Sequence, residues 1–143
     1  MPPPRVATVT PVSEADAGVR VAAIYADIRA TKRIDSVPNM WRVLATSPDQ
    51  LEWIWTRLKD VMHPESLGRT SRLDPITREA IALAVSATNG CAYCVNSHTA
   101  ALRKLGLDAE AVGEVLAITA LFNTTNTLAD AYQIEPDVLP PLD

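Results

Sequence analysis

Apolar residues recur at helical spacing along most of this 143-residue chain, in segments that end at Pro, Gly or Asn. Leu51, Ile54, Leu58 and Met62 are an example, since a spacing of three or four residues places them on one face of a helix. No run alternates polar and apolar residues over the length of a strand, and the sequence has no internal repeat and no Gly-rich phosphate loop. The pattern therefore predicts an all-α fold.

Cap residues and prolines set the expected bounds of these helices. Ser13 and Asp16 resemble a capping box, whereas Pro48 and Pro75 suit the first position of a helix. Gly106 is a natural stop signal, and Asp108 can cap the helix that follows it. The expected helices cover residues 13 to about 32, 38–45, 48–62, 75–88, 91–104 and 108–119, followed by a weakly helical stretch at 123–127 and further turns at 128–134.

Length and composition are those of one globular domain. Hydrophobic residues make up 48% of the chain and charged residues 21%, which is unlike a disordered protein. We expect residues 13–134 to form a compact, oligomerising helical domain between an N-terminal tail, 1–12, and a Pro-rich C-terminal tail, 135–143. The loop at 65–72 is short enough to lie within that domain.

Charge and hydropathy disfavour several classes of function. The net charge of −4, the absence of a basic block and an aromatic content of 5% argue against nucleic-acid binding. The longest uncharged stretch, residues 80–102, contains Asn89, Gly90 and Asn96, so we expect two core helices there rather than a membrane span. The N-terminus lacks a signal-peptide pattern, which favours a cytoplasmic protein.

Both cysteines and one of the two histidines lie within a short segment. Cys91, Cys94 and His98 fall on one face of a helix, and the break at Asn89-Gly90 puts Cys91 at its N-terminus. Free N–H groups and the helix dipole stabilise a thiolate there. Two sulfurs one turn apart can close a disulfide, and His98 is placed to take a proton from Cys94.

Glu79 lies on the preceding helix, whose apolar stripe indicates partial burial. A buried carboxylate needs a partner, and His98 on the next, antiparallel helix is a suitable one. In contrast, His63 precedes Pro64 at a helix end, where a cation suits the dipole, so we expect it to be structural. Trp41, Trp53 and Trp55 are expected to be core or subunit-interface anchors.

Two other interpretations of these residues stay open at this point. Cys91, Cys94, His98 and Glu79 together have the ligand types of a tetrahedral zinc site, although a carboxylate is a less common fourth ligand. Alternatively, the chain is a non-catalytic helical oligomerisation module, in which the cysteines act as small core residues.

Glu79, Cys91-Ala92-Tyr93-Cys94 and His98 resemble the core motif of the alkyl hydroperoxidase D-like proteins, within the wider carboxymuconolactone decarboxylase family. The motif covers residues 79–98, and a looser resemblance extends over about 37–106. The resemblance implies an all-helical homo-oligomer, often a trimer or hexamer. It also implies thiol-dependent reduction of a peroxide or of a partner's disulfide, as in a peroxiredoxin-type antioxidant enzyme. Such an enzyme uses an external thiol reductant and no cofactor beyond the cysteine pair.

The resemblance also implies a role for each residue. Cys94 matches the cysteine that forms the sulfenic acid, Cys91 its resolving and proton-donating partner, and Glu79 and His98 the proton relay. Tyr93 stands where well-studied members have a second relay histidine, and a phenol is a weaker proton shuttle at neutral pH. The decarboxylase branch works without a CxxC pair, so the cysteines argue against that activity. The helix N-terminus favours Cys91 as the attacking thiol, whereas the family match and His98 favour Cys94, which we adopt.

Overall fold

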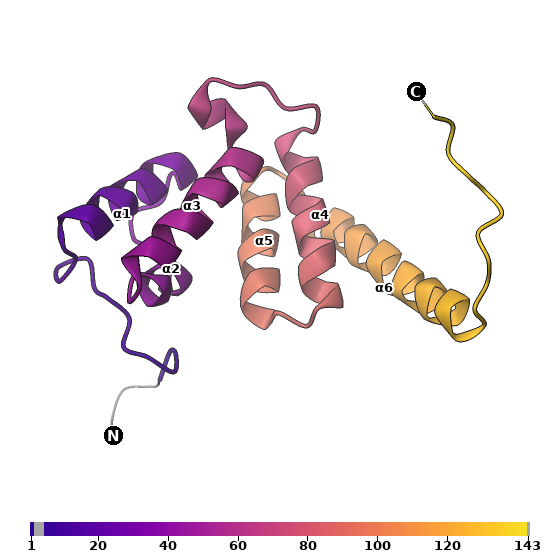
Figure 1. Cartoon of the computed structure of the whole chain (residues 1–143), viewed down its shortest axis with the longest axis horizontal. Helices are drawn as coiled ribbons and strands as arrows, with labels where there is room; N and C mark the ends of the chain where they lie inside the picture. Colours follow the sequence, from indigo (N-terminus) through magenta and orange to yellow (C-terminus); the bar gives the residue numbers. More distant parts are fainter. Residues whose placement is uncertain (2–4, 143) are drawn as a thin grey trace. The chain divides into compact units, whose positions relative to one another are not determined.

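The computed structural model describes residues 1 and 5–142, and every regular element in that part of the chain is a helix (Figure 1). The predicted all-α class is therefore confirmed. The chain divides into two compact units, Met1–Arg72 and Leu73–Asp143. The domain bounds expected from the sequence, 13–134, stay a prediction. The elements are α1 (Val19–Lys32), α2 (Asn39–Leu44), α3 (Pro48–Met62), the 3-10 helix η1 (Pro64–Leu67), α4 (Pro75–Thr88), α5 (Ala92–Lys104) and α6 (Ala109–Ala131).

The core of the first unit is formed by α1, α2 and α3. Tyr25, Ile28 and Leu51 are almost fully buried there. Trp41 and Trp55 are also buried and meet edge to face, with ring centroids 5.2 Å apart, a favourable arrangement of two aromatic quadrupoles. These two tryptophans are core anchors as predicted. The third, Trp53, is 64% exposed in this chain, so it is not a core anchor, and its interface role stays a prediction.

A polar cluster joins α1 to α3 beside this core. Asp27 accepts hydrogen bonds from Trp55 Nε1 at 2.8 Å and from Lys59 Nζ at 2.7 and 2.9 Å. Burial raises the pKa of Asp27, but the hydrogen bonds from Lys59 and Trp55 together outweigh it and hold that pKa below its ordinary value. The carboxylate form therefore stabilises the contact between the two helices.

Asp27→Asn removes the charge that pairs with Lys59 and is expected to lower the free energy of unfolding at neutral pH. The loss should be only about 1 kcal/mol, because Asp27 is partly exposed and water screens the ion pair. The stabilisation is complete above the pKa of an unfolded aspartate, near pH 4, and is lost as the pH falls through the lower folded pKa. Chemical denaturation from about pH 7 to about pH 2 should show the two proteins converging. The exposed Asp35→Asn is the control, and a loss independent of pH would contradict the assignment.

The second unit is built by α4, α5 and α6, which pack around Leu83, Leu102 and Val112. Asp74 caps α4 by accepting from Thr77 N at 3.0 Å, and Asp108 caps α6 by accepting from Ala111 N at 2.8 Å. Asp108 is the cap that the sequence predicted, and Asp74 directly precedes Pro75, the predicted first residue of α4. Within the described residues, no helix is both long enough and apolar enough to cross a membrane.

Two of the predicted helix bounds are wrong. The first helix begins at Val19, because Ser13 and Asp16 hydrogen-bond to each other in an isolated turn ahead of it. The last helix runs without a break from Ala109 to Ala131, through the polar stretch at 123–127. Thr124 and Thr127 donate their hydroxyls to the carbonyls four residues earlier, which satisfies these polar side chains inside the helix. The turns expected at 128–134 are thus largely the end of α6.

Candidate thiol site

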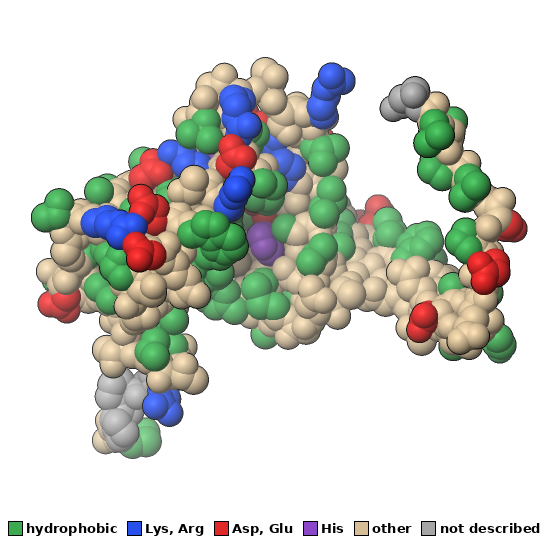
Figure 2. Space-filling view, viewed as in Figure 1, with side chains coloured by type: hydrophobic (Ala, Val, Ile, Leu, Met, Phe, Trp, Pro, Cys, Tyr) green, Lys and Arg blue, Asp and Glu red, His purple; other side chains and the backbone are tan. Residues whose placement is uncertain are grey.

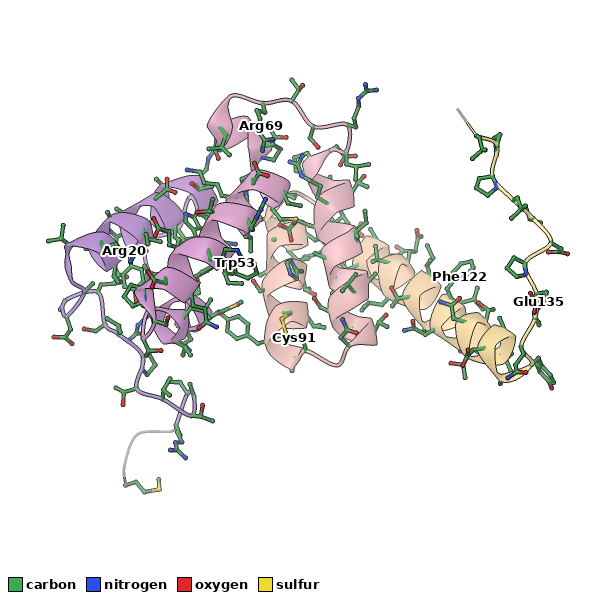
Figure 3. All side chains as sticks on the ribbon, in the orientation of Figure 1. Arg20, Trp53, Arg69, Cys91, Phe122 and Glu135 are labelled. Atoms are coloured by element: carbon green, nitrogen blue, oxygen red, sulfur yellow. A yellow bond between two sulfur atoms is a disulfide. The ribbon has the colours of Figure 1, made fainter. Side chains whose placement is uncertain are left out.

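Cys91 and Cys94 form a disulfide at the beginning of α5, with their Cα atoms 5.3 Å apart. Cys91 is the N-cap residue and Cys94 lies in the first turn; Figure 3 shows Cys91 at this end of the helix. Both side chains are half-buried. The position of Cys91 at a helix N-terminus and the reach of one sulfur to the other agree with the sequence analysis.

The turn between α4 and α5 fixes the backbone of Cys91. Gly90 has φ +70°, a left-handed conformation that costs a glycine little, and it lets the chain reverse directly after α4. Cys91 N then donates to the carbonyl of Ser86 at 3.0 Å, while Cys91 O accepts from Val95 N at 2.9 Å. These bonds tie the first cysteine to both helices, so its sulfur has a defined position.

The two sulfurs have different surroundings. The backbone N–H of Cys94 donates to Cys91 Sγ over 3.2 Å. Cys91 Sγ thus takes the place of the oxygen that usually caps a helix N-terminus. This N–H is one of the amides that a helix leaves without a backbone partner at its N-terminus, where the dipole also favours negative charge. Among the described residues, no hydrogen bond is made to Cys94 Sγ. This amide N–H is therefore placed to stabilise negative charge on Cys91 Sγ.

Glu79 of α4 pairs with His98 of α5, as predicted. The two helices lie side by side (Figure 1). His98 Nδ1 is 2.7 Å from Glu79 Oε2. The Glu79 side chain is only 12% exposed and that of His98 25%, so water screens the pair weakly. A carboxylate oxygen accepts, so Nδ1 carries the hydrogen, and Nε2 of the neutral imidazole is the nitrogen free to accept a proton.

The structure thus brings the predicted site residues together as two pairs. One is the disulfide and the other the Glu79–His98 contact, and α5 contributes a residue to each. His98 follows Cys94 by one helical turn, although no hydrogen bond joins it to either sulfur among the described residues in this disulfide form. The remaining histidine, His63, ends α3 in the first unit, where its N–H donates to Lys59 O, in keeping with a structural role.

Sequence reasoning missed one buried residue next to the site. Arg78 is only 6% exposed, although an Arg-Glu pair is typical of a solvated helix face. Its Nη1 donates to the carbonyl of Leu73 over 2.9 Å, so it fixes the beginning of the helix that carries Glu79. Nothing local in the sequence indicates this, because the burial comes from the packing of α4.

The donor types of a zinc site are present, but they are not arranged as one. In the described part of the chain, no group of three or more His, Cys, Asp or Glu side chains is placed to hold a metal ion. Cys91 and Cys94 are bonded to each other, which uses the two sulfurs that such a site would need. The zinc interpretation has no donor set in this form of the protein.

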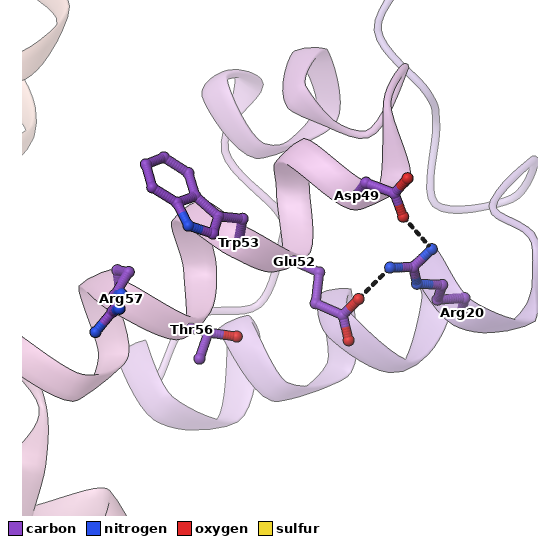
Figure 4. A pocket seen from close by; sticks show the side chains of 6 residues that line it. All are labelled: Arg20, Asp49, Glu52, Trp53, Thr56 and Arg57. Carbon is purple, nitrogen blue, oxygen red and sulfur yellow. Dashed lines mark hydrogen bonds and ion pairs between the residues drawn. The ribbon is translucent and has the colours of Figure 1, made fainter.

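A shallow pocket of about 450 Å³ lies in the first unit and contains none of these residues (Figure 4). Its Arg20 pairs with Glu52 and, at 2.7 Å, with Asp49; these hydrogen bonds raise the pKa of the guanidinium above its ordinary value. One guanidinium thus pairs with two carboxylates, and Trp53 and Arg57 complete the exposed wall. No cysteine or histidine lines this pocket, and none of the predicted site residues belongs to it.

The model of the carboxymuconolactone decarboxylase family matches residues 50–134, which is more than half of the chain. The chain belongs to this family. The match includes all of Glu79, Cys91, Cys94 and His98.

Within the family, the chain is an AhpD-like protein. It is 44% identical to the crystal structure of the alkylhydroperoxidase AhpD core from Rhodospirillum rubrum, covering 93% of this chain and 96% of that one, with a TM-score of 0.85. It is 45% identical over 64 residues to alkyl hydroperoxide reductase AhpD of Solibacter usitatus and 39% identical over 62 residues to that of Streptomyces avermitilis. These matches cover 45% and 43% of this chain, and the chain spans about a third of those relatives, 34% and 35% of their lengths.

Proposed function

We propose that this protein reduces peroxides with electrons from an external dithiol, by cycling Cys91 and Cys94 between the dithiol and disulfide forms. The observation that carries the proposal is the disulfide at the N-terminus of α5, one turn before a histidine held by a buried glutamate. The AhpD-like relatives support it, because their names describe hydroperoxide reduction.

Oxidation begins at Cys94. Glu79 holds Nδ1 of His98, so Nε2 takes the proton from the Cys94 thiol. The Cys94 thiolate attacks one peroxide oxygen, the O–O bond breaks, and the Cys91 thiol protonates the departing alkoxide. The products of this step are the Cys94 sulfenic acid, an alcohol and the Cys91 thiolate.

The disulfide closes in the second step. The Cys91 thiolate, stabilised by the N–H of Cys94, attacks the sulfenic sulfur, and the hydroxide leaves as water with the proton from His98. Two electrons have then passed from the cysteine pair to the peroxide. A dithiol returns them and is itself oxidised to a disulfide, so no further cofactor is required.

The test is peroxide consumption by the purified protein with dithiothreitol as the donor and cumene hydroperoxide as the substrate. We expect catalytic loss of peroxide, with one dithiol oxidised for each peroxide reduced. A parallel assay with a protein disulfide in place of the peroxide separates a disulfide reductase from a peroxidase. Peroxide loss no faster than the uncatalysed reaction would contradict the proposal and favour a non-catalytic helical module.

We also propose that the chain forms a homo-oligomer, a trimer or hexamer as the resemblance implies. Large apolar side chains are exposed along α6, and others on α4 reach the surface in Figure 2. On α6 they recur at helical spacing: Ile118, Leu121, Phe122 and Leu128, each between 49% and 59% exposed. A second copy would remove this stripe from water.

Leu121→Glu combined with Phe122→Glu is expected to reduce the mass in solution to that of a monomer, because burying two carboxylates in an apolar contact is unfavourable. Light scattering at micromolar concentration measures this mass. Val138→Glu is the matched control, since Val138 is an exposed apolar residue outside α6. A monomeric mass for the unmodified protein would contradict the proposal.

A further inference from the structure

We propose that the electron donor attacks the sulfur of Cys94, and that Cys91 leaves as the thiolate. This inference deepens the proposed function and rests on it, because it assumes that a dithiol reduces the disulfide. The disulfide bond alone does not distinguish the two sulfurs, and the inference gives each a different role in its reduction.

Hydrogen bonding favours Cys91 as the leaving sulfur. In thiol–disulfide exchange, the sulfur that leaves acquires negative charge, and exchange is faster when that charge is stabilised. Cys91 Sγ already accepts the N–H of Cys94 at 3.2 Å, and this bond strengthens when the sulfur becomes an anion. Cys91 is also the N-cap of the 13-residue helix α5, whose dipole favours an anion at that end.

The position of the base favours Cys94 as the sulfur under attack. His98 lies one helical turn after Cys94 but two turns after Cys91. Because Glu79 occupies Nδ1, the proton acceptor of the neutral imidazole is Nε2, which suits the deprotonation of a thiol that approaches Cys94. His98 thus assists the attack on Cys94 Sγ, and the N–H of Cys94 stabilises Cys91 Sγ as it leaves.

The disulfide is reduced in two successive exchange steps. The first thiol of the donor gives its proton to His98 and bonds to Cys94 Sγ, while the electron pair of the old disulfide goes to Cys91 Sγ. The second thiol of the donor then attacks the donor sulfur of this mixed disulfide and expels Cys94, which takes up the proton of that thiol, while His98 returns its proton to the Cys91 thiolate. The donor leaves as a disulfide, two electrons have been transferred, and both cysteines are reduced.

The first experiment maps the mixed disulfide. The oxidised protein is mixed with glutathione, a monothiol that cannot complete the second step, and the reaction is quenched with acid. The freed cysteine is then blocked with N-ethylmaleimide, and peptides are analysed by mass spectrometry. We expect glutathione on Cys94 and maleimide on Cys91, in about tenfold excess over the reverse pattern. Glutathione mainly on Cys91 would overturn this inference and leave the proposed function intact. A disulfide that no thiol reduces would overturn both.

The second experiment compares the two thiols one at a time. Cys94→Ser keeps the backbone N–H that faces Cys91, and Cys91→Ser keeps a favourable N-cap residue, so both variants retain the helix end. The rate of alkylation by iodoacetamide is measured against pH in each. We expect the Cys91 thiol to reach half its maximal rate about one pH unit or more below the Cys94 thiol. Equal midpoints, or a lower one for Cys94, would overturn the assignment of the leaving sulfur.

Discussion

Replacement of Cys94 by serine is expected to abolish peroxide turnover, with a loss of about 10³-fold or more. A histidine ionises a serine hydroxyl far less than it ionises a thiol. A hydroxyl also cannot be oxidised to a sulfenic acid. Cys91→Ser is expected to lose turnover as well, but by a different route. Its Cys94 still reacts once with peroxide and then persists as a sulfenic acid, because no second thiol is available to close the disulfide.

Dimedone labelling and mass spectrometry distinguish these two variants. A dimedone adduct should form on Cys94 in Cys91→Ser, whereas Cys94→Ser should give little or none. Ser97→Ala is the matched control, since Ser97 is an exposed residue of the same helix and has no role in the proposed chemistry. An adduct found only on Cys91, in the Cys94→Ser protein, would reverse the order of the two cysteines.

Glu79→Gln is expected to lower kcat/KM for peroxide by about 10²-fold. Glutamine fills the same space and can still accept a hydrogen bond from Nδ1 of His98, but it lacks the negative charge that stabilises the imidazolium after proton transfer. Because the variant changes the charge and not the shape, the fold should be retained. Glu79→Asp keeps the charge on a shorter side chain and should recover part of the loss.

The pH profile separates this role from a purely structural one. The loss in Glu79→Gln should shrink at alkaline pH, where the Cys94 thiol ionises without help from a base. Steady-state turnover and far-UV circular dichroism across the pH range measure the two effects. Glu114→Gln, an exposed change on α6, is the control. A loss that is the same at every pH, or that accompanies unfolding, would contradict the relay.

Helix ends that depend on neighbouring residues alone could be predicted from the sequence. Asp74 and Asp108 begin α4 and α6 because a capping carboxylate needs only the amides of the next turn. The same kind of signal fails at Ser13 and Asp16, where an isolated turn satisfies both side chains without a helix. The continuation of α6 was not predictable from helix propensity. Thr127 and its neighbours donate hydroxyl hydrogen bonds to backbone carbonyls of the helix, and this satisfies polar side chains that would otherwise disfavour it.

Most of the candidate site was also predictable, since its spacing follows from one helix and the turn before it. The partnership of Glu79 with His98 follows from a carboxylate and an imidazole on adjacent antiparallel helices. The burial of Arg78 and the exposure of Trp53 depend on tertiary packing, which the spacing of residues does not determine. The bond from the Cys94 N–H to Cys91 Sγ depends on the rotamer of one side chain, and it shows that the two cysteines are not equivalent.

The proposed peroxidase function is best tested by the rate at which peroxide produces the Cys91–Cys94 disulfide in the reduced protein. Rapid mixing with cumene hydroperoxide, acid quench and mass spectrometry of the peptides give this rate. We predict one disulfide for each peroxide consumed, at a rate about 10²-fold or more above that of an unactivated thiol, and substantially slower in Glu79→Gln. Disulfide formation no faster than that of a free thiol, and unaffected by Glu79→Gln, would contradict the proposed peroxidase function.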